Sequence, residues 1–238
     1  RMALGACQAL GVELQHALTL AAATELLHNA SLVHDDLQDQ DAERRGQQAV
    51  WMKYDANTAI CTGDLLLSCS YGLLAQYRDH SLVGVLLRRM HARTAQAVLG
   101  QNADLSHQNQ TLHDLSVYKQ IVIAKSGALL SLPLELALIA AHQDAFCARA
   151  CEAAQAFSLG YQIIDDLDDY ASDQLRVSGQ VLNVLQVLGQ ETDIASAQTH
   201  AVRLAREQLE RSIALANDLP LDSGALLIQI AQKLLARL

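Results

Sequence analysis

Apolar residues recur at helical spacing along most of the chain. Through residues 2–32, 58–74 and 82–99 they return every three or four positions, which places them on one face of an α-helix. Glycines stand where such helices end or pack closely: Gly46, Gly63, Gly100 and Gly160. The pattern predicts an all-α bundle of nine or ten helices and gives little support for strands.

The most apolar stretch, residues 127–141, contains Pro133 and Glu135. A bilayer helix needs about 20 consecutive apolar residues, so we expect a core helix, kinked at Pro133, and no transmembrane segment. The chain has 238 residues, of which 51% are hydrophobic and 4% aromatic. This composition predicts one large helical domain over residues 1–238 with an aliphatic core. The sequence as given does not begin with a signal-peptide pattern, and because it opens abruptly on Arg1 we expect that part of the natural N-terminus is missing.

Charge and cysteine content narrow the functional classes. A formal net charge of −9 without a basic stripe argues against a nucleic-acid surface. Five cysteines without a framework spacing favour a reducing, cytoplasmic location. Cys147 and Cys151 lie one helical turn apart and could hold a metal, but no second Cys/His pair is evident, so we favour core packing.

Two aspartate-rich boxes of the same form are the main chemical signal. They span residues 35–39 and 165–169, and each follows an apolar run. Residues i and i+4 share a face of a helix, so each box aims two or three carboxylates at one point. A solvated acidic helix end is the alternative for one box, but carboxylates that continue an apolar face need a charge partner. Mg²⁺ usually binds one or two carboxylates together with phosphate oxygens, so the boxes predict a phosphorylated substrate.

Basic residues supply the other half of a phosphate site. Arg44 and Arg45 follow the first box and precede Gly46, and two adjacent guanidinium groups on a turn can bind two different anions. Lys125 is a lone lysine in an otherwise apolar segment, where burial requires an anionic partner such as a diphosphate. His34 precedes the first box and either orients it by hydrogen bonding or packs between helices.

Taken together, these segments resemble the trans-isoprenyl diphosphate synthase family of head-to-tail prenyltransferases. The resemblance covers most of the chain, and five motifs occur in the family's order. They are residues 32–39 with the following Arg-Arg-Gly, the Gly-Asp-Leu-Leu at 63–66, residues 118–129 with Lys-Ser-Gly-Ala, the Gly-Tyr-Gln-Ile-Ile at 160–164, and the second box.

The resemblance implies the isoprenoid synthase fold, a helical bundle with a central cavity, and a homodimer. It implies condensation of isopentenyl diphosphate with an allylic diphosphate. About three Mg²⁺ ions would be held by the carboxylates of Asp35, Asp36, Asp39, Asp165, Asp166 and Asp169. The allylic diphosphate would be held by Arg44, Lys125, Ser126 and Gln162. Isopentenyl diphosphate would face Arg45 and Gln101, and Arg1 matches a family arginine only weakly, because Met2 stands where the family has proline.

Product length is expected to depend on the turns that precede the first box. Ser31, Ala30 and Leu27 lie one and two turns before Asp35 and should line the tunnel for the growing tail. Short-chain family members carry bulky aromatic residues at the two positions that Ala30 and Ser31 occupy. Small residues there predict a product of C20 or longer, unless they merely allow close helix packing.

The segment after the second box departs from the family, because Gln180 stands where a lysine is usual. This departure favours a non-catalytic or regulatory subunit of a prenyltransferase, which the two intact boxes oppose. A class I terpene cyclase would share the helical cavity and the metal-triggered ionisation. It would normally replace the second box with a different metal triad and contain more aromatic residues. A purely structural bundle is the remaining alternative.

Overall fold

A computed structural model describes residues 1–107, 114–173, 182–190 and 192–238. Eleven α-helices occur within these ranges, one more than the upper expectation: α1 Met2–Ala9, α2 Leu14–Gln38, α3 Val50–Lys53, α4 Ala56–Ala75, α5 His80–His107, α6 Leu115–Val122, α7 Ala128–Ala140, α8 Cys147–Asp173, α9 Val184–Leu188, α10 Ile194–Asn217 and α11 Ala225–Leu235. Single turns of other helix types lie at Ile123–Gly127, Asp144–Phe146 and Pro220–Asp222. The predicted all-α fold is confirmed.

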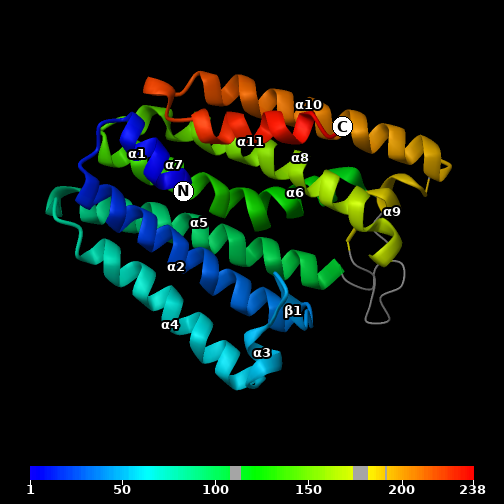
Figure 1. Ribbon diagram of the computed structural model, residues 1–238, viewed down its shortest axis with the longest axis horizontal. Coiled ribbons are helices and arrows are strands. Elements are labelled where there is room, and N and C mark those ends of the chain that lie inside the picture. Colours follow the sequence, from blue (N-terminus) through cyan, green and yellow to red (C-terminus); the bar gives the residue numbers. More distant parts are fainter. Residues whose placement is uncertain (108–113, 174–181, 191) are drawn as a thin grey trace.

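The long helices run roughly alongside one another (Figure 1). Helix α8 packs against α7 and α10, and α10 packs against α11. Helix α2 packs against α4 and α7, and α5 packs against α7 and α4. The core between them is mainly aliphatic, with Leu20, Leu86, Leu136 and Ile163 all fully buried. This core fixes α2, α5, α7 and α8 relative to one another, and these helices or the turns adjoining them carry most of the candidate site.

Side-chain caps define where several helices begin. Asp55 accepts a hydrogen bond from the backbone N of Thr58 at the start of α4, and Asp193 does the same for Ser196 at the start of α10. Such caps satisfy backbone N–H groups that have no partner inside the helix. Short polar residues between apolar runs therefore locate these helix starts.

The apolar run at residues 2–32 forms two helices, which is part of the reason for the larger helix number. Gly11 lies between α1 and α2 with φ +71°, a conformation that a glycine adopts without a steric penalty. Pro133 lies inside α7, which continues through it. The departure from α-helical geometry comes earlier, in a π-helical turn at Ile123–Gly127.

Two helical stretches in the described residues are long and apolar enough to cross a membrane by length and composition. The first, Leu115–Ala140, exceeds the 15 residues considered from the sequence because α6, the π turn and α7 are continuous. In its most apolar window, 61% of the residues are buried inside the protein, which is typical of a core helix. The second is α4, where the corresponding figure is 22%.

Candidate active site

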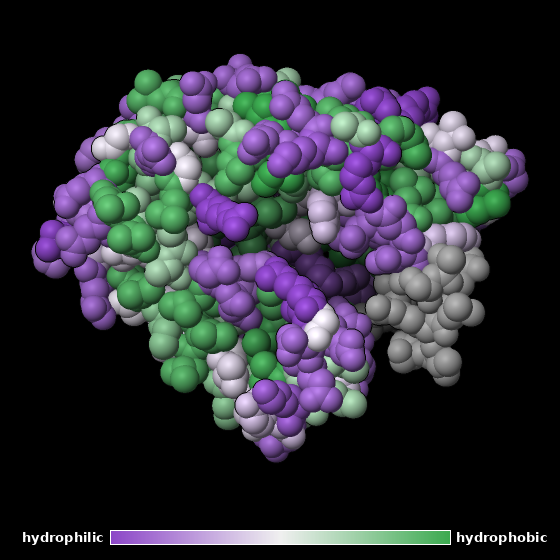
Figure 2. All heavy atoms as spheres, in the orientation of Figure 1, coloured by the Kyte–Doolittle hydropathy of each residue, from purple (hydrophilic) through white to green (hydrophobic). Residues whose placement is uncertain are grey.

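The two aspartate boxes lie at the same end of the bundle. The first box ends α2 and the second lies near the end of α8, and both helices run towards the same side of the molecule (Figure 1). Figure 2 shows a hollow near the middle of one face, bordered largely by hydrophilic residues. The predicted pairing of the boxes in space is therefore consistent with the packing of the helices.

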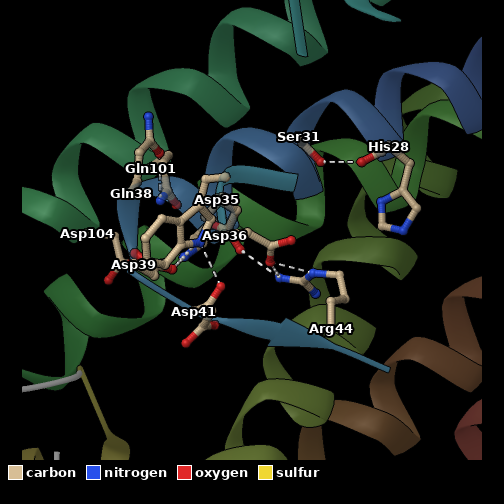
Figure 3. Close-up of polar contacts among 12 residues, drawn as sticks. His28, Ser31, Asp35, Asp36, Gln38, Asp39, Asp41, Arg44, Gln101 and Asp104 are labelled. Carbon is tan, nitrogen blue, oxygen red and sulfur yellow. Dashed lines mark hydrogen bonds and ion pairs between the residues drawn. The ribbon is translucent and has the colours of Figure 1, made fainter. Parts of the chain in front are cut away.

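Arg44 holds one carboxylate of the first box. It follows the box on a two-stranded hairpin, β1 Glu43–Arg44 and β2 Gln47–Gln48, which was not predicted. Arg45 and Gly46 both have positive φ, as the two central residues of a type I′ turn require. The turn brings Arg44 back to α2, where its Nε donates to Asp36 Oδ1 at 2.6 Å and its Nη2 lies 3.7 Å from Asp35 Oδ2 (Figure 3).

Lys125 lies among three carboxylates. Its Nζ is 2.7 Å from Asp104 Oδ2, 3.3 Å from Asp35 Oδ1 and 3.7 Å from Asp39 Oδ2. Burial alone lowers the pKa of Lys125, but the three carboxylates outweigh it and hold this pKa above its ordinary value. Lys125 is therefore a fixed positive charge beside the first box, and its role in binding a diphosphate stays a prediction.

A π-helical turn and a glycine bring Lys125 to this position. Lys125 lies within the turn Ile123–Gly127, and π turns inside helices are frequent at functional sites. Helix α5 crosses the turn at Gly100, where an added Cβ would lie 2.3 Å from the backbone N of Lys125 and 2.6 Å from the carbonyl carbon of Ala124. Only a glycine permits this approach, which places Asp104, one turn later on α5, against Lys125.

Asp166 of the second box is bound by protein donors. It is 4% exposed, and its carboxylate accepts hydrogen bonds from Tyr118 Oη (2.8 Å), Gln162 Nε2 (2.9 Å) and the backbone N of Val184 (2.7 Å). Burial raises the pKa of Asp166 to about 7, and the three hydrogen bonds act in the opposite direction. Asp165 and Asp169 are more exposed than Asp166, and both interact with neighbouring groups.

One helical segment contacts both boxes. Tyr118, which binds Asp166, lies seven residues before Lys125, which contacts Asp35 and Asp39. Seven residues of α-helix rise by about 10 Å. The continuous segment formed by α6 and the π turn therefore links the second box to the first.

The remaining diphosphate candidates lie around these groups. Gln101 Nε2 donates to Gln38 Oε1 at 3.1 Å, which places it beside the first box (Figure 3). Ser126 is half-buried in the π turn, and Arg45 is exposed at the tip of the hairpin. Arg1 is exposed ahead of α1. The assignment of these residues to individual substrates stays a prediction.

Of the candidate tunnel residues, Ser31 is the most accessible. It is half-buried on the face of α2 that carries Asp35, and its hydroxyl donates to His28 O at 2.8 Å. Ala30 and Leu27 are each 3% exposed. They lie at helical spacing from His34, which packs on α4. The tunnel role of all three positions stays a prediction.

His34 packs between helices. Its Nε2 lies 3.4 Å from Ile60 O and 3.5 Å from Asp64 Oδ1 on α4. An added Cβ on Gly63 would occupy the position of the His34 ring. Of the two roles considered for His34, helix packing is the one seen, and it also explains Gly63.

Three residues near the boxes were not predicted as site residues. Asp104 looked like an ordinary helix acid, Asn183 follows the second box at a distance, and His28 lies two turns before Asp35. Burial lowers the pKa of His28. The negative charge of Glu25 opposes this effect, whereas the positive charges of Arg45 and Arg44 add to it. The spacing of Gly100 and Asp104 on one helix face was the available signal for Asp104. Gln180 lies outside the described residues.

The donor set fits a metal that is shared with a phosphate ligand. Among the described residues, no three His, Cys, Asp or Glu side chains converge closely enough to bind an ion by themselves. Mg²⁺ is usually bound by one or two carboxylates together with phosphate oxygens and water. Asp35 and Asp39, which both face Lys125, can provide such a partial set.

Cys147 and Cys151 are both buried, and burial raises the pKa of Cys147 to about 11, in line with core packing.

Comparison with known proteins agrees with this geometry. The chain is 30% identical over 229 residues to the all-trans-nonaprenyl-diphosphate synthase (geranyl-diphosphate specific) of Rhodobacter capsulatus, covering 96% of this chain and 69% of that protein. It is 32% identical over 188 residues to the geranylgeranyl diphosphate synthase of Cyanophora paradoxa, covering 76% of this chain but 63% of that protein. A solved geranylgeranyl pyrophosphate synthetase from Geoglobus acetivorans has the same fold, with a TM-score of 0.87 and 23% identity over 98% of this chain and 85% of that one. Residues 1–183 match the sequence profile described as polyprenyl synthetase, and the chain therefore belongs to the polyprenyl synthetase family.

Proposed function

We propose that the protein is a prenyltransferase that condenses isopentenyl diphosphate with an allylic prenyl diphosphate. The observation that carries the proposal is the position of Lys125 among Asp35, Asp39 and Asp104. A half-buried cation beside carboxylates that continue a helix face is suited to a diphosphate with its metal ions. Family membership supports the same reaction, whereas the whole activity and its substrates remain our proposal.

The reaction begins when the allylic C–O bond breaks and its electron pair leaves with the diphosphate. Lys125 and Arg44 would stabilise the charge that develops on this leaving group, because both are already fixed by carboxylates before the substrate arrives. Asp35, Asp39, Asp165 and Asp169 are the proposed metal ligands. Asp36 and Asp166 were also expected to bind metal, and their carboxylates accept hydrogen bonds from Arg44 and from Tyr118, Gln162 and Val184. Mg²⁺ bound there would supply further charge stabilisation at the diphosphate.

Isopentenyl diphosphate would be held by Arg45 and Gln101, with His28 close to the two arginines. Burial lowers the pKa of His28 and so favours its neutral ring, which can both donate and accept a hydrogen bond. The double bond of isopentenyl diphosphate attacks the allylic carbon when the two are held close and in line. A proton then leaves the new product, and the departing diphosphate is the proposed acceptor, as the family resemblance implies.

We propose a product of C20 or longer. Support comes from Ser31, which is small and half-buried on the Asp35 face of α2. The relatives' names include farnesyl, geranylgeranyl and nonaprenyl products, so they do not decide the length. Pure protein would be incubated with labelled isopentenyl diphosphate, Mg²⁺ and each allylic primer, and the dephosphorylated products separated by chromatography. Farnesol as the sole end product would contradict the proposed length, and no condensation with any primer would contradict the proposed activity.

The same assay tests the tunnel residues. Ser31→Phe should shorten the product while retaining the first condensation, because a ring at this position would limit the volume available to the tail. Asn29→Phe on the same helix is the control. An unchanged product distribution in Ser31→Phe would show that the tail does not pass this residue.

We propose that the protein is a homodimer in which α4 and α5 contact a second copy. Large apolar side chains on these helices are exposed, including Ile60 (46%) and Leu65 (64%) on α4 and Leu99 (69%) on α5. Packing such residues on a partner would remove apolar surface from water. Light scattering at micromolar concentration should give twice the monomer mass, and Leu65→Asp should reduce it. A monomeric wild-type protein would refute the assembly.

A further inference from the structure

The outer face of α4 carries two thiols on either side of an exposed leucine. Cys61, Leu65 and Cys69 recur every fourth residue, which places them in one row along the helix. Leu65 is 64% exposed and both of these cysteines are exposed, whereas the other three cysteines of the chain are buried. Helix α4 lies at an outer edge of the bundle (Figure 1), so the row can contact a second molecule.

The two exposed thiols cannot pair within one chain. Residues 61 and 69 are eight positions apart on a continuous helix, which separates their Cα atoms by about 12 Å. A disulfide requires Cα atoms within about 7 Å of each other. A disulfide between these two positions must therefore join two copies of the chain.

The row is suited to contact with its own copy. In a two-fold interface the same surface occurs on both sides, so charges within it would face like charges. Helix α4 contains one charged residue, Asp64, and its carboxylate lies 3.5 Å from His34 Nε2 of the same chain. The row of Cys61, Leu65 and Cys69 is itself uncharged, which permits such a contact and removes the apolar surface of Leu65 from water.

A two-fold axis beside Leu65 would bring the two different cysteines together. Two α4 helices related by this axis run antiparallel, so the position four residues before Leu65 in one copy lies opposite the position four residues after it in the other. Helices most often pack through their i±4 rows, and these rows then run alongside each other. Cys61 of each copy would lie beside Cys69 of the other copy, at two equivalent places.

We propose that Cys61 and Cys69 form a redox-controlled lock of the dimer, in which each Cys61 forms a disulfide with Cys69 of the other copy. The inference rests on the homodimer proposed above, to which it adds the register of α4 and a site of modification. The oxidant is a small-molecule disulfide such as oxidised glutathione. One cysteine thiolate attacks a glutathione sulfur and releases a glutathione thiol, and the second cysteine displaces the other glutathione. For each bond formed, the protein thiols lose two electrons and two protons, and one glutathione disulfide becomes two thiols.

The test exposes the full chain, purified under reducing conditions, to oxidised glutathione at micromolar protein concentration. Covalent dimer is measured by electrophoresis without reductant. Cys61→Ser and Cys69→Ser should each form it more slowly than wild type by about tenfold or more, because each variant lacks one member of both pairs and thiols held at an interface react at a high effective concentration. Co-expressed as differently tagged copies, the two variants should form covalent dimer again, because the mixed dimer retains one Cys61–Cys69 pair.

The pattern among the variants separates this register from others. Undiminished covalent dimer in either single variant would overturn the proposal, because it would require like cysteines to pair across the axis. Leu65→Asp keeps both thiols and is the matched control, which should lose the cross-link together with the interface. Cross-linking of Leu65→Asp at the wild-type rate would show random collision of exposed thiols and would also overturn the proposal.

Light scattering under reducing conditions tests the homodimer separately. A wild-type dimer that oxidised glutathione does not cross-link would overturn the lock and leave the proposed assembly intact. A monomeric wild type would refute the assembly and the lock together. Cosedimentation of such a monomer with phosphatidylcholine vesicles would assign the outer face of α4 to a lipid surface instead.

Discussion

Replacing Gly100 by alanine should push α5 away from the π turn that carries Lys125 in the candidate diphosphate site. The new Cβ would lie 2.3 Å from the backbone N of Lys125 and 2.6 Å from the carbonyl carbon of Ala124, where ordinary contacts begin at 3.4 Å. The atoms in the way belong to the backbone, so α5 and the π turn must move apart by about 1 Å, since no side chain can yield in their place. The same movement separates Asp104 from Lys125.

Both stability and activity should fall, to different extents. Overpacking of this kind costs about 1–3 kcal/mol, and each kcal/mol lowers the melting temperature by about 2–4 °C in a domain of this size. A misplacement of about 1 Å at a catalytic group can lower activity about 100-fold. We therefore expect Gly100→Ala to be largely folded at 25 °C but strongly impaired in kcat/KM.

Gly84→Ala in the same helix is the control. A Cβ at Gly84 would meet only Arg88 Nη1, at 3.4 Å, so the substitution should stabilise the protein by about 0.5–1 kcal/mol through helix propensity. Calorimetry and steady-state kinetics would be measured on both variants. Wild-type kcat/KM in Gly100→Ala, at the same folded fraction, would refute the argument that this crossing positions Lys125.

Two further predictions concern other charged residues. Arg45→Ala should raise KM mainly for isopentenyl diphosphate and Lys125→Ala should impair use of the allylic substrate, and equal effects of both variants on both substrates would refute this division. Glu135 is 0% exposed and paired with Arg93 at 2.7 Å, so Glu135→Ala should lower the urea-unfolding free energy by about 3–5 kcal/mol. The exposed control Glu207→Ala should stay within about 0.5 kcal/mol of wild type. Similar losses in the two variants would show that the buried ion pair of Glu135 contributes no more to stability than an exposed glutamate does.

The sequence predicted those parts of the site that depend on a single helix. The spacing of Asp35 and Asp39 placed both on one face of α2, and the structure brings both to Lys125. The isolated position of Lys125 in an apolar segment predicted an anionic partner, for which a diphosphate was expected, and the partners in the structure are the carboxylates of Asp35, Asp39 and Asp104. Gly63 and Gly100 were expected to lie near helix ends or at close packing points, and the structure shows close packing at both.

Features that depend on contacts between distant segments were not predictable. Asp104 reaches Lys125 only because α5 crosses the π turn at Gly100, and the spacing of Gly100 and Asp104 does not by itself indicate which segment α5 crosses. The direction of Asp166 depends on Val184, 18 residues later. The hairpin after the first box was missed because Arg45, a residue that rarely adopts positive φ, occupies its turn.

Mg²⁺-dependent condensation by the wild type, Asp35→Ala and Asp165→Ala is the most direct test of the central claim that the two boxes form one active site. Turnover would be followed as incorporation of labelled isopentenyl diphosphate at saturating Mg²⁺, with circular dichroism to confirm that each variant is folded. We predict turnover that requires a divalent cation in the wild type and falls by at least 100-fold in both folded variants, as expected when metal-dependent stabilisation of the leaving group is lost. Undiminished turnover in either variant, or wild-type turnover in the presence of a chelator, would contradict it.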